Sequence, residues 1–253
     1  MKKLVFILFL AGILFSCKED ENKTPNEENN STPELKARVN LMPTYQGNPV
    51  SLNEEYTTQE GYTISFTRVD IIFTNFKNNN GKQLFESAIY KMNEDKRLLW
   101  KGKGNYSEFN SIAADVGVGP AENHEDPSAR EQDDPLFILN SGEMHWGWNP
   151  GYIFIMLEGK ADTTVNQTGN DLMNFFYHIG EDTLLQHVPI TDLNWQKESK
   201  SLYSTTLKLD LYKVFDGDTQ DVDIKAERKS HTLPSEMDLS KRVIENLTNA
   251  ISK

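Results

Sequence analysis

The chain is poor in the features that mark most well-known enzyme classes. It has one cysteine, Cys17, so an intramolecular disulfide is excluded. Walker, Rossmann, His-Glu-x-x-His and Gly-x-Ser-x-Gly motifs are all missing, and there is no internal repeat. Positive charge is scarce, because 26 Lys and Arg against 38 Asp and Glu give a formal net charge of -12. Nucleic acid demands a basic surface, so we predict no nucleic-acid partner. Because the catalytic motifs are missing, we also predict that the protein is not an enzyme.

The N-terminus contains the chain's longest apolar run, residues 4–15, preceded by Lys2 and Lys3. The run is too short to span a membrane comfortably and is typical of a signal peptide. Residues 14–17 read Leu-Phe-Ser-Cys, which looks like a bacterial lipobox, whose cysteine is lipidated and becomes the mature N-terminus. The alternative is a signal-anchor with an incidental cysteine. The Lys-Glu-Asp-Glu that follows resembles a surface-export signal.

These features predict three regions and a location. Residues 1–17 form a lipoprotein signal peptide, with Cys17 as the lipidation site and the membrane as partner through the lipid. Residues 18–33 contain no apolar side chain besides proline, and we expect a disordered tether. Residues 34–253 form one domain. We expect an outer-membrane lipoprotein that faces the periplasm or the cell surface.

Alternating apolar and polar residues predict strands over 35–41, 62–66, 112–118 and 203–211. The apolar phase shifts near Arg68, which indicates a β-bulge, and the Asn-Asn-Asn-Gly at 78–81 indicates a hairpin turn. The period changes at the end of the chain, where Leu239, Val243 and Leu247 recur every four residues. Ser235 and Asp238 resemble a capping box at the start of this helix. The predicted fold is all-β, an antiparallel β-sandwich with a C-terminal α-helix.

Residues 144–152, Met-His-Trp-Gly-Trp-Asn-Pro-Gly-Tyr, place two of the four tryptophans beside a methionine and a histidine. Asn-Pro-Gly is a turn signal, and the apolar run at 152–157 after it predicts a strand buried on both faces. Packing alone explains most tryptophans. Imidazole is also a good copper ligand, and thioether sulfur favours Cu(I), so a copper site lined by aromatic residues is a second interpretation.

This stretch and three others resemble the MbnP-like family of methanobactin-associated copper-binding proteins. The family signature is Met-x-Trp-x-Trp-x-x-Gly-Tyr followed by Glu-Gly, which here is 158–159. The Phe-Tyr-His-Ile-Gly at 176–180 is similar to the family's aromatic-His-x-Gly strand, and the Asp-Asp-Pro-Leu at 133–136 to its acidic-Pro segment. Ser-His at 230–231, followed by the helix with Asn246, resembles the family's ending.

The resemblance implies a copper protein that binds Cu(I) through histidine and through kynurenine, which a diheme peroxidase-like partner makes from a motif tryptophan. It points to Trp146 as the modified position and Trp148 as the second choice. His178 and His231 are the expected imidazole ligands, and His145 is the third candidate.

Two departures and one alternative remain open. Residues 41–45 lack the histidine that family members often carry there, and Gly-Val-Gly at 117–119 lacks a family carboxylate. Either loss would fit weaker copper binding, or a domain that keeps the fold without the metal. The alternative function is a non-catalytic surface module that binds a glycan or a protein partner through the Trp-Gly-Trp turn.

Overall fold

The structure, a computed structural model, describes residues 34–92, 97–147, 151–167, 169, 172–218 and 220–253. The predicted signal peptide, its Cys17, the tether and Trp148 lie outside these residues. Within them, no helix is long and apolar enough to cross a membrane.

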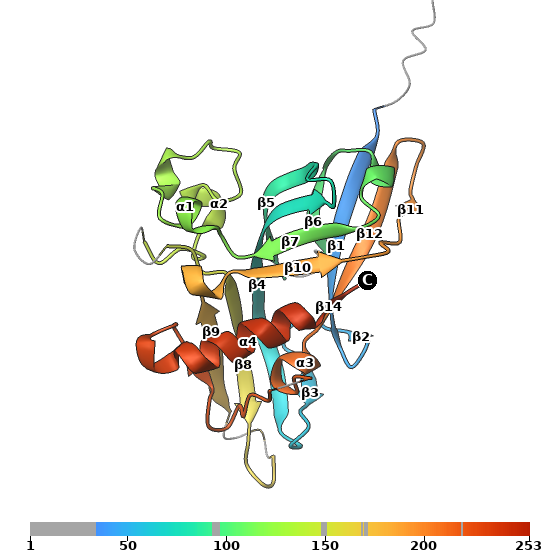
Figure 1. The fold of residues 1–253 in the computed structure, drawn as a ribbon. Helices are drawn as coiled ribbons and strands as arrows, with labels where there is room; N and C mark the ends of the chain where they lie inside the picture. Colours follow the sequence, from blue (N-terminus) through green and yellow to red (C-terminus); the bar gives the residue numbers. More distant parts are fainter. Residues whose placement is uncertain (1–33, 93–96, 148–150, 168, 170–171, 219) are drawn as a thin grey trace, which may run out of the picture. The chain divides into compact units, whose positions relative to one another are not determined.

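Two β-sheets account for most of the regular structure (Figure 1). The smaller sheet has the order β11-β12-β1-β2, with β14 also paired to β12 and β6 to β1. Its strands are β1 (Lys36–Tyr45), β2 (Asn48–Pro49), β6 (Leu98–Lys103), β11 (Gln196–Lys197), β12 (Leu202–Asp210) and β14 (Ile251–Ser252).

The larger sheet has the order β10-β7-β4-β8-β9-β13, and β3 and β5 also pair with β4. Its strands are β3 (Glu55–Thr57), β4 (Thr63–Asn78), β5 (Gln83–Lys91), β7 (Ile112–Val116), β8 (Ile155–Asp162), β9 (Met173–Ile179), β10 (Gln186–Ile190) and β13 (Lys229–Ser230). The all-β class is confirmed. Most pairs are antiparallel, but β1 pairs with β12 and β9 with β13 in parallel, so the sheets are mixed.

Three short α-helices, one helix of 13 residues and four 3-10 turns complete the described elements. The helices are α1 (Pro120–Asn123), α2 (Ile138–Ser141), α3 (Tyr212–Phe215) and α4 (Met237–Asn249). The 3-10 turns are η1 (Tyr106–Glu108), η2 (Pro127–Ala129), η3 (Asp182–Leu184) and η4 (Pro234–Glu236).

Several local predictions are confirmed. The register of β4 against β8 shifts between Phe66 and Arg68, where the sequence predicts a bulge. Gly81 has a φ of 78°, and its amide donates to the carbonyl of Asn78, which closes the predicted turn.

Two element boundaries differ from the prediction. The strand predicted over 152–157 begins at Ile155, because Tyr152 forms an isolated bridge with His145 and the amide of Ile153 donates to the carbonyl of Met144. The expected capping box of Ser235 and Asp238 is wrong. The carboxylate of Glu236 instead accepts the backbone N–H groups of His231 and Leu233, so a 3-10 turn leads into α4.

The core is rich in aromatic rings contributed by both the sheet and the helices. Phe66 of β4 and Phe175 of β9 pack edge-on, and Phe215 of α3 contacts both rings. Helix α4 contacts β9, β10 and β13, and the predicted stripe of Leu239, Val243 and Leu247 is buried. One face of β9 therefore packs in the core, and the side chains on its other face lie outside the core.

Candidate functional site

His178 and His231 are neighbours, although 53 positions separate them in the sequence. Strand β13 runs parallel to β9 with Ser230 beside Tyr177, which brings the next residue, His231, next to His178. The two imidazole centroids are 5.0 Å apart, with the rings nearly perpendicular at 81°. The ring of Phe176 packs 5.0 Å from His231 and 5.7 Å from His178. The fold therefore builds a pair of imidazoles against one aromatic ring.

The alternation of β9 explains why these side chains are not in the core. Phe175, Tyr177 and Ile179 are buried on one face, so Phe176 and His178 point to the opposite face. The alternation of residues 174–180 in the sequence predicts this division of side chains between two faces, and the burial of the strand confirms it.

Glu158 of β8 is bonded to His178. Its Oε1 lies 2.8 Å from Nε2 of the imidazole, and the two side chains are 31% and 17% exposed. A carboxylate accepts from a ring N–H, so the proton of the neutral imidazole is assigned to Nε2. The lone pair of Nδ1 is then available to a metal ion, and the carboxylate fixes the tautomer, as it commonly does for metal-binding histidines.

Burial lowers the pKa of His178 below its ordinary value, because desolvation penalises the imidazolium. The hydrogen bond and the charge of Glu158 oppose this effect, while His231 and Arg68 add to it. The result keeps the imidazole neutral at neutral pH, which is the form that binds metals.

A cavity of about 400 Å³ opens beside the histidine pair. It is lined by residues of β4, β8 and β9 and of the segment after β13, namely Thr67, Glu158, Gly159, Lys160, Asn174, Phe175, Phe176, His178 and His231. The pair is therefore accessible from outside the core.

Trp146 lies beside the end of β9, near this pair. A Cβ built on Gly180 would be 3.2 Å from Cζ3 of its indole. The amide of Gly180 donates to Oγ1 of Thr232, and that hydroxyl donates to the carbonyl of His178. The indole thus packs against a junction that also holds His178 and the residue after His231.

A second link connects the tryptophan turn to the sheet. Arg68 of β4 donates through Nε to Asp70 at 2.6 Å, and its other nitrogen pairs with Glu143, just before the turn. The charges of Arg68 and His178 act on each other, as do those of Glu143 and His178. Arg68 therefore ties the turn to the strand face that carries His178.

His145 is placed differently from the other two histidines. Its ring packs edge-on against Tyr152 at 4.5 Å, and the amide of Gly147 donates to its Nδ1 at 2.8 Å. The proton must then sit on Nε2, which is buried and has no hydrogen-bond partner among the described residues. His145 lines a separate cavity of about 310 Å³, together with Asp126 and Pro127. His145 therefore lines a different cavity from His178 and His231.

A family model named MbnP matches residues 34–237 of the sequence. The chain belongs to the MbnP family. This family is linked to copper and to methanobactin. Among solved structures, MbnP from Methylosinus trichosporium is similar, with a TM-score of 0.46 and 14% identity over 76% of this chain and 79% of that one. None of the curated proteins matches the chain.

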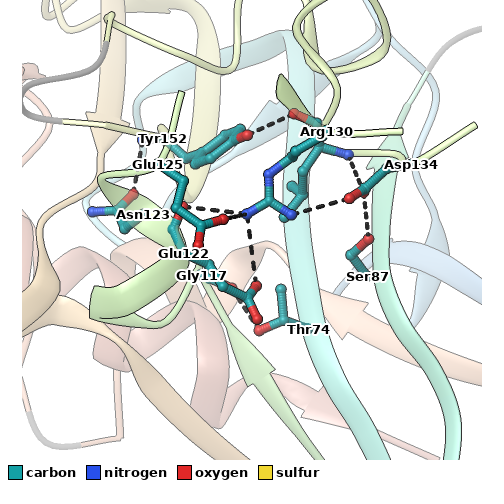
Figure 2. A network of polar contacts seen from close by, with 10 residues as sticks. Thr74, Ser87, Gly117, Glu122, Asn123, Glu125, Arg130, Asp134 and Tyr152 are labelled. Carbon is teal, nitrogen blue, oxygen red and sulfur yellow. Dashed lines mark hydrogen bonds and ion pairs between the residues drawn. The ribbon is translucent and has the colours of Figure 1, made fainter. Parts of the chain in front are cut away.

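The MbnP motif tyrosine is held by a polar network that the sequence did not predict (Figure 2). Arg130 lies in an acidic loop, residues 120–135. It pairs with Asp134 at 3.0 Å and with Glu125 at 3.4 Å, and its guanidinium lies 5.8 Å from the ring centroid of Tyr152. The hydroxyl of Tyr152 donates to the carbonyl of Leu136 at 2.6 Å. Arg130 is the one arginine among the acidic residues of this loop, and that contrast in charge could have indicated an ion-pair network here.

The network gives the acidic-Pro segment a structural role. Asp134 accepts from the amide of Leu136 and from the hydroxyl of Ser87, in addition to its pair with Arg130. The amide of Tyr152 donates to the side chain of Asn123. The loop therefore positions the residue that ends the tryptophan turn.

We next asked whether the described side chains include a larger set of metal ligands. Over the described part of the chain, no group of three or more His, Cys, Asp or Glu side chains is placed to hold a metal ion. The donor chemistry that fits copper is the imidazole pair of His178 and His231, with Glu158 orienting one ring.

Proposed function

We propose that this MbnP-family chain binds Cu(I) through Nδ1 of His178 and the imidazole of His231, and that it serves copper acquisition or handling without catalysing a reaction. The contact between the two rings, 5.0 Å between centroids, is the observation that carries the proposal. Copper bound there would be a transferable, redox-active ion held by neutral nitrogen donors.

Three features of the chain support this assignment. The lowered pKa of His178 keeps the imidazole in its neutral form, with the lone pair of Nδ1 free of a proton. The carboxylate of Glu158 fixes the ring and its tautomer. Both histidines line an accessible cavity, so an ion can reach them.

We also propose that Trp146 is converted to kynurenine, with Trp148 as the second choice. A diheme peroxidase-like partner would cleave the C2–C3 bond of the indole and place one oxygen atom on each carbon. Two molecules of hydrogen peroxide are the oxidant, each supplying one oxygen atom and being reduced to water, and hydrolysis of the N-formyl product then releases formate. The position of the Trp146 ring beside Gly180, close to His178, supports this choice.

The proposed location follows from the N-terminal sequence. A lipid on Cys17 would anchor the protein in the outer membrane, facing the periplasm or the cell surface, and residues 18–33 would act as the tether.

Competition for Cu(I) against a chromophoric chelator tests the histidine pair. His178→Ala and His231→Ala should each weaken binding, while His187→Ala is the matched control. His187 is also bonded to a carboxylate, Asp115, but its side chain is 61% exposed and it lies on β10, at the far end of the strand order. If the three variants bind Cu(I) equally well, the pair is not the site.

Intact mass measured with and without the co-expressed peroxidase-like partner tests the modification. Conversion to kynurenine exchanges one carbon for one oxygen, and Trp146→Phe should remove this mass change. A change that persists in the variant assigns the modification to another tryptophan. An unmodified protein that binds no Cu(I) but retains a glycan would favour a glycan-binding module.

A further inference from the structure

The outer face of the smaller sheet carries an unusual arrangement of positive charge. Alternate residues of β1 are buried in the core, so Lys36 and Arg38 lie on the opposite, outer face of the strand. On the neighbouring strand β6, Lys103 is directly opposite Lys36, and Lys101 is directly opposite Arg38. The four side chains therefore form two cross-strand pairs of like charge on one surface, which we call the basic face.

This arrangement costs stability. Like charges that lie directly opposite each other destabilise an antiparallel pair of strands. Arg38 and Lys103 each form an ion pair with a glutamate, at 3.0 and 3.1 Å. Lys36 and Lys101 are exposed and have no ion-pair partner among the described residues, although the chain has 38 acidic side chains. The positive charge of the basic face is therefore left available to a partner outside the domain.

Protection of a sheet edge does not explain the basic face. Lysine on an edge strand commonly prevents aggregation through that edge. Strand β1 is not an edge, because it pairs with β6 on one side and with β12 on the other. Leu98 of β6 lies opposite Asn40, is 47% exposed and adds an apolar side chain to the same surface. Positive charge beside exposed apolar surface is typical of protein surfaces that bind anionic lipid.

The polypeptide enters the domain at this face. Glu34, the first residue that the structure describes, pairs with Lys103, and β1 begins two residues later. The tether proposed for residues 18–33 would have an end-to-end distance of about 20–24 Å as a flexible chain. A lipid on Cys17 would therefore hold the basic face close to a bilayer, where its effective concentration is high.

We propose that the basic face binds the anionic phospholipid surface of the membrane in which the protein is anchored. The formal net charge of -12 means that the chain as a whole is repelled by such a surface, so this face determines the orientation of the domain. The cavity beside the histidine pair is lined mainly by strands of the other sheet and shares no residue with the basic face. The inference rests on the membrane anchor proposed above and is independent of the copper ligands.

Labelling of lysines on vesicles tests the proposal. The full chain is reconstituted into vesicles of phosphatidylcholine, or of phosphatidylcholine with phosphatidylglycerol, and is treated with an amine-acylating reagent. Peptide mass spectrometry gives the labelling rate of each lysine. Lys36, Lys101 and Lys103 should react at least about fivefold more slowly on the anionic vesicles, because each lysine near such a surface contributes about a fivefold factor to binding.

Two controls separate lipid contact from other effects. Lys225 and Lys241 are exposed outside the smaller sheet and should react equally on both kinds of vesicle. In 1 M NaCl, where the Debye length is about 3 Å, the slower labelling of the basic face should disappear.

Two double variants test whether the position of the charge matters. Lys36→Gln/Lys101→Gln removes the two unpaired charges, and the fold should be at least as stable because like charges no longer lie opposite each other. Lys103 should then react as fast on anionic vesicles as on neutral ones. Lys225→Gln/Lys241→Gln changes the net charge equally, and Lys103 should keep its slow reaction.

Three results would overturn the inference. Equal labelling of Lys36 on both kinds of vesicle, in protein that sediments with both, would refute the basic face as the lipid contact and leave the anchor standing. Fast labelling of Lys103 in both double variants would show that net charge alone holds the protein to the lipid. Protein that sediments with neither kind of vesicle would refute the anchor and the basic face together.

Discussion

Gly180→Ala is expected to damage the junction between β9 and the tryptophan turn. A Cβ at this position would collide with the carbonyl oxygen of Tyr152. It would also lie 3.1 Å from Cα of Ile153 and 3.2 Å from the indole of Trp146. Two of these three contacts are to backbone, which cannot move aside by changing a rotamer. The glycine of the aromatic-His-x-Gly motif is therefore explained by close approach of the chain.

The size of the effect follows from two opposing terms. Adding a methyl group to a filled site typically costs about 1–3 kcal/mol. Restricting the unfolded chain by replacing glycine with alanine returns about 0.4–1 kcal/mol. Because backbone rather than side chain blocks the space, we expect a net loss of about 1–2 kcal/mol in the free energy of unfolding.

Urea denaturation of Gly180→Ala and of Gly119→Ala measures this difference. Gly119 has nothing within 4 Å of an added Cβ and a φ of -62°, so alanine fits there. The control should be neutral or slightly more stable than the parent. Equal midpoints for the two variants would refute the claim that the junction is filled.

Three further predictions concern other parts of the chain. Leu247→Ala should lower the free energy of unfolding by about 2–5 kcal/mol, because it empties a fully buried site on α4. Thermal unfolding measures this, and a loss no larger than that of a surface substitution would contradict it. Cys17→Ser should release the protein from membranes in cell fractionation, since the anchor is proposed to depend on its lipid, and unchanged membrane association would argue against lipidation. Cu(I) affinity should be constant above about pH 6.5 and decrease below it, because only neutral imidazole binds metal and burial lowers the pKa of His178. A decrease in affinity that starts well above this pH would exclude His178 as the titrating ligand.

The sequence was sufficient for elements whose pattern is local. The alternation in β9 separated Phe175 and Tyr177 from His178, and the phase shift at Arg68 located the bulge in β4. The four-residue recurrence identified the buried face of α4. In each case the periodicity of one segment sets which side chains enter the core.

Contacts between distant segments were not predictable in the same way. The parallel pairing of β1 with β12 joins strands more than 150 residues apart. No local turn connects the two strands, so no turn sequence could have predicted that they pair. The bond from Glu158 to His178 depends on the register of β8 against β9, and the pair with His231 depends on β13. His145 was attractive because of its neighbours in the sequence, but the amide of Gly147 occupies its Nδ1.

The candidate site combines two kinds of support. The proposed copper ligand His178 and the carboxylate of Glu158 that orients it are on adjacent strands, where a slip of one residue would exchange the core face for the site face. Burial of the aromatic core therefore also fixes the ligand geometry. Trp146 is on a turn instead, and it is positioned by the Arg68–Glu143 pair and by the loop that Arg130 organises (Figure 2). It follows that substitutions in the Arg130 loop should change how Trp146 is presented to a modifying enzyme, while the histidine pair stays in place.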